Sequence, residues 1–139
     1  MLIRGGNIVS ADLAQSPAQE FIIVEDLVAT TGTTVGAVLK LENTYGVDIL
    51  VTDVMIVVAT AAGAANTIDM GVDDGGDVTS ALLIDGLAMN ATGVHDNRVN
   101  AGTNGGAAIW KDGEYIVATA SATLASLVGY AVIKGIAVA

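Results

Sequence analysis

The fold is decided by residues 113–139, which read GEYIVATASATLASLVGYAVIKGIAVA. Val, Ile and Tyr are concentrated in two segments, which predicts strands at 114–120 and 127–138 joined by a connection of Ser, Thr and Ala. Alternate residues of the second strand are apolar on both faces: Val128, Tyr130, Val132, Ile136 and Val138 on one, and Leu127, Ala131, Ile133 and Ala137 on the other. We therefore expect both faces of this strand to be covered.

Upstream of this pair the chain shows further apolar runs separated by turn residues. The predicted strands are 21–24, 36–43, 47–60, 67–73, 80–85 and 107–110. The longest, 47–60, alternates at first and is then continuously apolar, which indicates either a β-bulge near Asp53 or a fully buried central strand. No segment has a sustained helical period. About eight strands predict an all-β fold, a jelly-roll-like antiparallel β-sandwich.

The N-terminal part of the chain differs from the rest. Residues 1–27 are predicted as an extended N-terminal arm or edge strand, and residues 28–139 as a single β-sandwich domain. One interpretation is a frayed terminus with one edge strand. The other is an arm that docks on a neighbouring subunit through Phe21, Ile22, Ile23 and Val24.

Composition limits the partners. Apolar residues make up 53% of the chain and charged residues only 14%, whereas a free-standing soluble domain carries about a quarter charged residues. This deficit indicates burial against other chains. The net charge of −10 argues against binding to nucleic acid or to anionic lipid. The uncharged stretch 115–133 carries Ser and Thr at its centre and β-branched flanks, so no membrane span is predicted.

Residues with catalytic or metal-binding chemistry are sparse. His95, Asp96 and Arg98 lie together, but no serine has the context of a nucleophile, and we predict no enzyme activity and no cofactor. Asp73, Asp74 and Asp77 form an acidic turn that is either solvated or a cation site, although the spacing misses the calcium-loop pattern. Residues 91–106 form a long Gly- and Asn-rich loop that is a candidate for binding.

From Val51 to the C-terminus the sequence resembles a family of small virion proteins of tailed bacteriophages, found in head gene clusters. The segments that carry the resemblance are the strand before Ala61-Ala62-Gly63, then Ile68–Val72, Leu83–Leu87, Gly93–Asn97, Gly102–Gly106, Gly113–Ile116, Ala120–Ala122 and Leu127–Gly129. The resemblance implies a jelly roll or related β-sandwich, commonly trimeric, that decorates a capsid where capsomers meet. It carries over no catalytic residues.

The leading hypothesis is a non-enzymatic phage virion structural protein. It would be a capsid decoration (cement) protein, made in the host cytoplasm and placed on the capsid surface, that bridges subunits of the major capsid protein as a homotrimer. The predicted contacts are Phe21, Ile22, Ile23 and Val24 in the arm, and either Leu127, Ala131 and Ile133 or the opposite face with Tyr130. The alternative is a surface module of a phage head or tail that binds a glycan or another ligand, with or without calcium.

Overall fold

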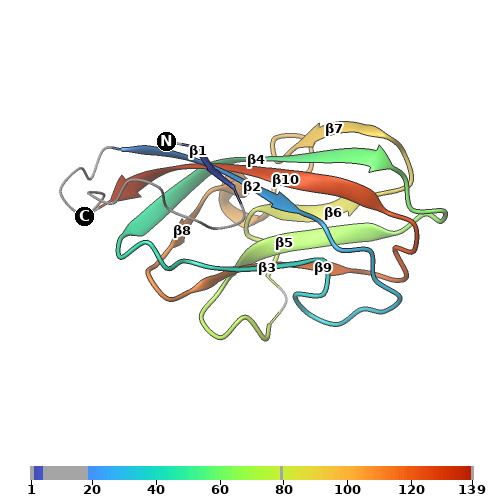
Figure 1. Ribbon diagram of the computed structural model, residues 1–139, viewed down its shortest axis with the longest axis horizontal. Coiled ribbons are helices and arrows are strands. Elements are labelled where there is room, and N and C mark those ends of the chain that lie inside the picture. Colours follow the sequence, from blue (N-terminus) through green and yellow to red (C-terminus); the bar gives the residue numbers. More distant parts are fainter. Residues whose placement is uncertain (1, 5–18, 79, 139) are drawn as a thin grey trace.

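The computed structural model describes residues 2–4, 19–78 and 80–138, and in this part of the chain ten strands form two layers (Figure 1). A single short 3-10 helix, η2, interrupts them in the described residues. The strands are β1 Leu2–Arg4, β2 Glu20–Asp26, β3 Leu39–Glu42, β4 Asp48–Thr60, β5 Thr67–Asp73, β6 Ile84–Ala88, β7 Gly93–Asp96, β8 Ala108–Trp110, β9 Tyr115–Ala120 and β10 Val128–Val138; η2 is Thr103–Gly106.

The strands pair as nested hairpins. One sheet has the order β1-β2-β10-β4-β7, with β8 also paired to β4, and the other has the order β3-β9-β5-β6. β2 therefore pairs with β10, β3 with β9, β4 with β7 and β8, and β5 with β6, so the first half of the chain runs antiparallel to the second. Rolling such a ribbon into two sheets gives a jelly roll, which confirms the predicted fold class. β1 is the exception, because it runs parallel to β2.

Two predicted strands differ from the observed ones, and β7 was not predicted. The predicted strand 36–43 is shorter, because Gly36 has φ +72° and leaves β3 to begin at Leu39. The predicted strand 80–85 is displaced to β6, 84–88. β7 lies inside the segment predicted as a loop, 91–106, because its four residues, GVHD, are partly or fully exposed and show no apolar alternation.

The strand β2 belongs to the six-stranded sheet along its whole length. Its residues from Glu20 to Asp26 pair with β10 from Ile136 to Tyr130. The segment that holds Phe21–Val24 is thus a strand of the sandwich, between β1 and β10. Residues 5–18 of the predicted arm lie outside the described residues.

The hydrophobic core lies between the two sheets. Ile23, Ile56 and Ile133 face it from the larger sheet, and Met70 and Ile116 from the smaller one; all are at most 1% exposed. Fully burying such a side chain contributes about 1.5–3 kcal/mol.

Three aromatic rings close one end of this core. The ring of Tyr45 lies 5.7 Å from that of Phe21 and 5.9 Å from that of Trp110, centroid to centroid. The indole Nε1 of Trp110 donates to the carbonyl of Glu114 at 2.8 Å. Burial, followed by the nearby carboxylate of Glu25, raises the pKa of Tyr45 to about 12, so the phenol stays neutral.

Two glycines of β10 accommodate bulges in β4. The register shifts between Val128 and Gly129 and again between Lys134 and Gly135. At the second shift Lys134 faces Asp53 and Gly135 faces Val51, which leaves Thr52 as the extra residue and confirms the predicted bulge near Asp53. A Cβ on Gly129 would lie 2.3 Å from the carbonyl oxygen of Val57, so the backbones approach too closely for a side chain.

Gly135 gives a direct test of this packing. A Cβ there would lie 2.5 Å from Cγ2 of Ile49 and 2.7 Å from the carbonyl oxygen of Leu50. We expect Gly135→Ala to lower the free energy of unfolding by about 1–3 kcal/mol, the cost of overpacking. The measurement is urea unfolding at a fixed protein concentration. Gly63→Ala is the control, because nothing lies within 4 Å of its added Cβ, and a change within about 0.5 kcal/mol is expected there. Equal effects of the two substitutions would contradict the packing argument.

Candidate interaction surface

The two faces of β10 have different surroundings. Ala131, Ile133 and Ala137 are at most 1% exposed and pack in the core. On the opposite face Val128 is 56% exposed, Tyr130 37% and Ile136 38%. A single chain therefore covers only one of the two apolar faces of this strand.

The ladder extends this apolar face to the neighbouring strands. On β2, Ile22 lies beside Lys134 and Val24 beside Val132, and on β4, Met55 and Val57 lie beside Val132 and Tyr130. Val94 of β7 faces Val57, and Ile109 of β8 faces Leu50. We call this surface the outer face; its apolar residues are Ile22, Val24, Leu50, Met55, Val57, Val94, Ile109, Val128, Tyr130, Val132 and Ile136.

The outer face concentrates the exposed apolar side chains of the chain. Of the eight large hydrophobic residues that are exposed in the described part, five lie on it: Val94, Ile109, Val128, Tyr130 and Ile136. Single exposed hydrophobic residues are normal on a protein surface, whereas a contiguous patch indicates a contact with another molecule. The outer face is therefore the candidate interaction surface.

The structure separates the predicted contact residues into two groups. Phe21, Ile23, Leu127, Ala131 and Ile133 are at most 3% exposed and pack in the core of their own chain. Ile22, Val24 and Tyr130 lie on the outer face. A contact between subunits stays a prediction, and it now concerns these three residues. Val94 and Ile109 were missed, because only the strand register shows that they lie beside β4.

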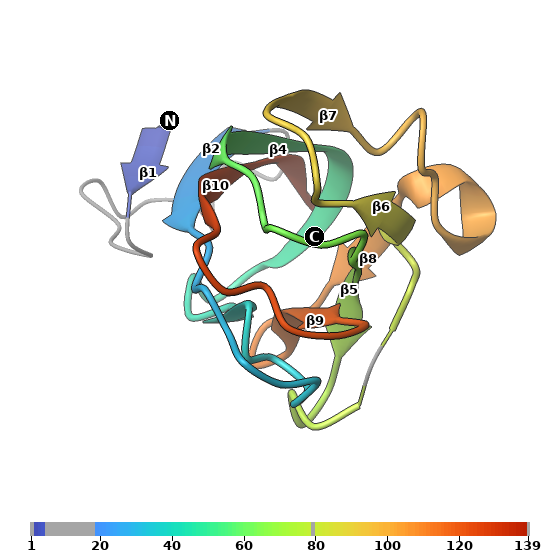
Figure 2. The same cartoon turned by 90° about the vertical axis from the view of Figure 1, so that its right-hand side faces the viewer.

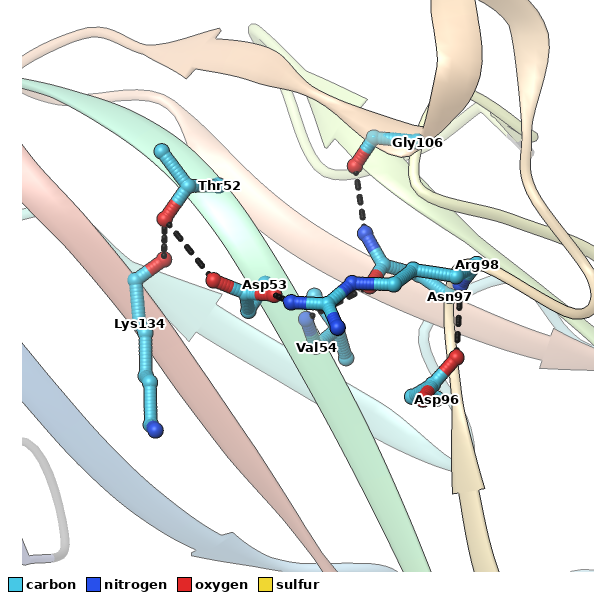
Figure 3. A network of polar contacts seen from close by, with 8 residues as sticks. All are labelled: Thr52, Asp53, Val54, Asp96, Asn97, Arg98, Gly106 and Lys134. Atoms are coloured by element: carbon cyan, nitrogen blue, oxygen red, sulfur yellow. Dashed lines mark hydrogen bonds and ion pairs between the residues drawn. The ribbon is translucent and has the colours of Figure 1, made fainter.

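Polar side chains on β4 and beside it interrupt the apolar residues of the outer face (Figure 3). Arg98 pairs with Asp53, Nη2 to Oδ1, at 2.7 Å. Thr52, the bulged residue, donates to the Asp53 carboxylate at 3.3 Å. Asp53 in turn lies beside Lys134 of β10 in the ladder. The exposed ion pair contributes little stability, and its main effect is to place charge beside the apolar residues.

Asn97 fixes the point where β7 leaves β4. Its side chain is buried, its Oδ1 accepts from the amide of Val54 at 3.2 Å, and its Nδ2 donates to the carbonyl of Gly106 at 2.7 Å (Figure 3). The backbone amide of Asn97 also donates to the carbonyl of Val54 at 3.0 Å. The side-chain amide thus continues the ladder after the strand has ended, and it ties the 97–107 loop to β4.

We expect Asn97→Ala to lower the free energy of unfolding by on the order of 3 kcal/mol, because it leaves the Val54 amide and the Gly106 carbonyl without partners. Arg98→Ala is the matched comparison in the same network. The Arg98 side chain is 76% exposed, so its loss is expected to cost less than about 1 kcal/mol. Urea unfolding of the two variants measures both values, and the reverse ranking would show that the exposed ion pair, not the amide, holds the loop.

The acidic turn after β5 is occupied by groups of the chain itself. Oδ2 of Asp73 accepts from the amides of Gly75 at 3.1 Å and Asp77 at 3.0 Å. Nζ of Lys40 lies 3.7 Å from Asp77 and 4.9 Å from the centroid of the Tyr115 ring. In the described part of the chain no group of three or more His, Cys, Asp or Glu residues is arranged to hold a metal ion.

The hydrogen bonds to Asp73 give a pH prediction. Those bonds, led by the amide of Asp77, lower the pKa of Asp73 below its ordinary value of 3.8. A lowered pKa in the folded state contributes stability that is present above the unfolded value and is lost as pH falls through the folded value. We therefore expect wild type to be more stable than Asp73→Asn above pH 3.8 and the difference to shrink below it. Unfolding of both proteins across this range measures the difference, and a gap independent of pH would contradict the assignment.

The remaining sequence candidates lie in strands and turns of the sandwich. His95 lies in the β7 ladder opposite Ile56, and the carboxylate of Asp96 accepts from the amide of Arg98 at 2.9 Å. The uncharged stretch 115–133 forms β9, a connection and the start of β10. Within residues 2–4, 19–78 and 80–138, no helix has the length and apolar character needed to cross a membrane.

Comparison with known proteins gives a structural relationship only. No protein-family model and no curated protein matches the sequence. A chain in the capsid of Ralstonia phage GP4 matches with a TM-score of 0.57 and 14% identity, covering 99% of this chain and 97% of that one. A chain in the acidic stable capsid of Helicobacter pylori bacteriophage KHP30 matches with a TM-score of 0.49 and 12% identity, covering 85% and 91%. Over nearly its whole length the protein therefore has the fold of a chain found in the capsid of phage GP4.

Proposed function

We propose that this protein is a non-enzymatic structural component of a phage virion, a capsid decoration protein that bridges subunits of the major capsid protein as a homotrimer. The observation that carries the proposal is the outer face, a sheet surface whose apolar residues are left exposed by the chain itself. The full-length match to a chain of the GP4 capsid supports it, because a jelly roll of this size is compatible with that setting.

The outer face binds by burial of apolar surface. Tyr130 and Ile136 are each more than a third exposed and Val128 more than half, so a partner laid across β10 removes much apolar area from water. Each square ångström of apolar area buried contributes about 25 cal/mol before the costs of association are subtracted. On a capsid many copies of one contact act together, so a modest single contact suffices for stable attachment.

The β2 residues take part as members of the sheet rather than as a free arm. Ile22 and Val24 are positioned by the ladder to β10, so binding requires no ordering of their backbone. The carboxylates of Asp48 and Asp53 on β4 and of Asp96 on β7 belong to the same sheet. A partner surface with basic groups around an apolar centre complements this arrangement.

The proposal is tested by substituting Tyr130→Glu and measuring how many copies bind to purified capsids of the phage that encodes the protein. A buried, unpaired carboxylate at the centre of the contact is costly, and we expect occupancy to fall at least about tenfold, equivalent to 1.4 kcal/mol. Val78→Glu is the matched control, because Val78 is 61% exposed and lies in the connection after β5, in the other sheet. Unchanged occupancy of Tyr130→Glu, or equal loss in the control, would count against the outer face as the contact.

A further inference from the structure

The charges of the chain are segregated between the two ends of the sandwich. Four connections carry no Asp, Glu, Lys, Arg or His: 27–38 before β3, 61–66 before β5, 89–92 before β7 and 121–127 before β10. All four lie at one end of the sandwich, the end that Figure 2 turns toward the viewer. We call this surface the uncharged end.

The strand registers show that these connections meet. Thr60, at the end of β4, pairs with Val128 at the start of β10, and Asp26, at the end of β2, pairs with Tyr130. In the smaller sheet the start of β5 pairs with the ends of β6 and β9, and β3 begins beside β9 near the same level. In an antiparallel pair the start of one strand lies beside the end of its partner. The four connections therefore share one end of the molecule.

The opposite end is acidic. The connections there, 43–47, 74–83 and 111–114, together with the strand residues beside them, hold seven acids. They are Glu42, Asp48, Asp73, Asp74, Asp77, Asp112 and Glu114. Lys40 pairs with Asp77 and Lys111 with Glu114, which leaves this end strongly negative.

The uncharged end is held in shape by hydrogen bonds between its connections. The amide of Leu124 donates to the carbonyl of Thr30 at 2.8 Å, and the hydroxyl of Thr123 donates to the carbonyl of Thr31 at 3.1 Å. Nδ2 of the buried Asn66 donates to the carbonyl of Thr123, and the carbonyl of Asn66 accepts from Met89. A surface cross-linked in this way loses little conformational freedom on binding.

Two hollows lie on this end. One, of about 430 Å³, is lined by small side chains such as Ala64, Ala122 and Ala125. The other, of about 460 Å³, is lined by Leu127, Val128 and Tyr130 and by Asp26, the last residue of β2 and the one acid directly beside the four connections; it joins the uncharged end to the outer face. The two surfaces are therefore continuous, and small side chains on the first allow the backbone of a partner to approach closely.

We propose that the uncharged end is the surface through which copies of this protein contact one another. Each chain carries a net charge of −10, so two copies repel wherever their acids come within about a Debye length, 8 Å at physiological ionic strength. A contact through the acidic end brings seven acids of each copy together, whereas a contact at the uncharged end holds the acidic ends apart. Among the surfaces through which two copies could meet, the charges favour the uncharged end, and the occupant assigned to it is a second copy of the chain. This inference takes self-association and the number of copies from the proposed function, and the charges select the surface.

The salt dependence of self-association tests the inference first. A contact without charges between highly negative chains strengthens when salt screens the repulsion, whereas a contact made of ion pairs weakens. The mass of the full-length protein, by sedimentation equilibrium, is expected to exceed one chain at micromolar concentration. It is expected to rise as NaCl increases from about 0.01 M to about 1 M, over which the Debye length falls from about 30 Å to about 3 Å. A single-chain mass at both salt concentrations would overturn the inference.

Charge insertion tests the surface. Ala64 and Ala125 are exposed, so Ala64→Glu and Ala125→Glu leave the core intact and place carboxylates where copies meet. Each is expected to weaken self-association at least about tenfold. Val78→Glu adds the same charge away from this end and is expected to leave association within about twofold, since a rise of one unit on −10 is small. Equal weakening in all three variants, or unchanged mass in both Ala variants, would overturn the assignment. Circular dichroism and urea unfolding confirm that each variant is folded.

The same variants distinguish this inference from the proposed function. If copies associate through the uncharged end but the protein binds no capsid, the virion role fails and the self-contact stands. If wild type and Ala125→Glu occupy capsids equally as single chains, the self-contact fails and a virion role through the outer face stands.

Discussion

The ladder between β4 and β10 is the interaction on which the rest of the structure depends. It runs from Thr60 and Val128 to Asp48 and Val138, in the middle of the larger sheet, with β2 on one side and β7 and β8 on the other. Glycines at 129 and 135 allow this ladder to absorb two bulges of β4 without interruption. Its register decides which side chains enter the core and which form the outer face.

Within a single jelly roll, a strand that is apolar on both faces buries only one of them. The smaller sheet covers one face of the larger sheet, and no described element of this chain covers the other (Figure 1). The low proportion of charged residues has a related origin, because the four connections of the uncharged end carry no charge and apolar residues alternate with a few charged ones on the outer face. Composition, sheet topology and exposed area therefore point to one property: the chain is suited to contact with other chains.

The sequence predicts the positions of the strands better than it predicts which face of each strand is buried. The strands at 67–73, 114–120 and 127–138 and the bulge near Asp53 could be predicted, because β-branched runs and turn residues mark them locally. The inward face of β10 could not, because both faces are apolar and only the partner strands choose between Ile133 and Tyr130. β7 was missed for a different reason: its four residues show no apolar alternation, and the side chain of Asn97, which continues its pairing with β4, has no signature in the local pattern.

The distribution of charge also limits how the protein can be oriented in an assembly. Lys40 and Lys111 pair with acids on the acidic end, and Arg98 pairs with Asp53 of β4. The two lysines neutralise part of the negative charge of the acidic end without reversing its sign. If neighbouring copies met through their acidic ends, the remaining carboxylates of one copy would lie within a Debye length of those of the other and repel them. In the proposed homotrimer the acidic end therefore faces water or a basic partner. A closed ring of copies is then compatible with the charges only if the axis lies nearer the uncharged end.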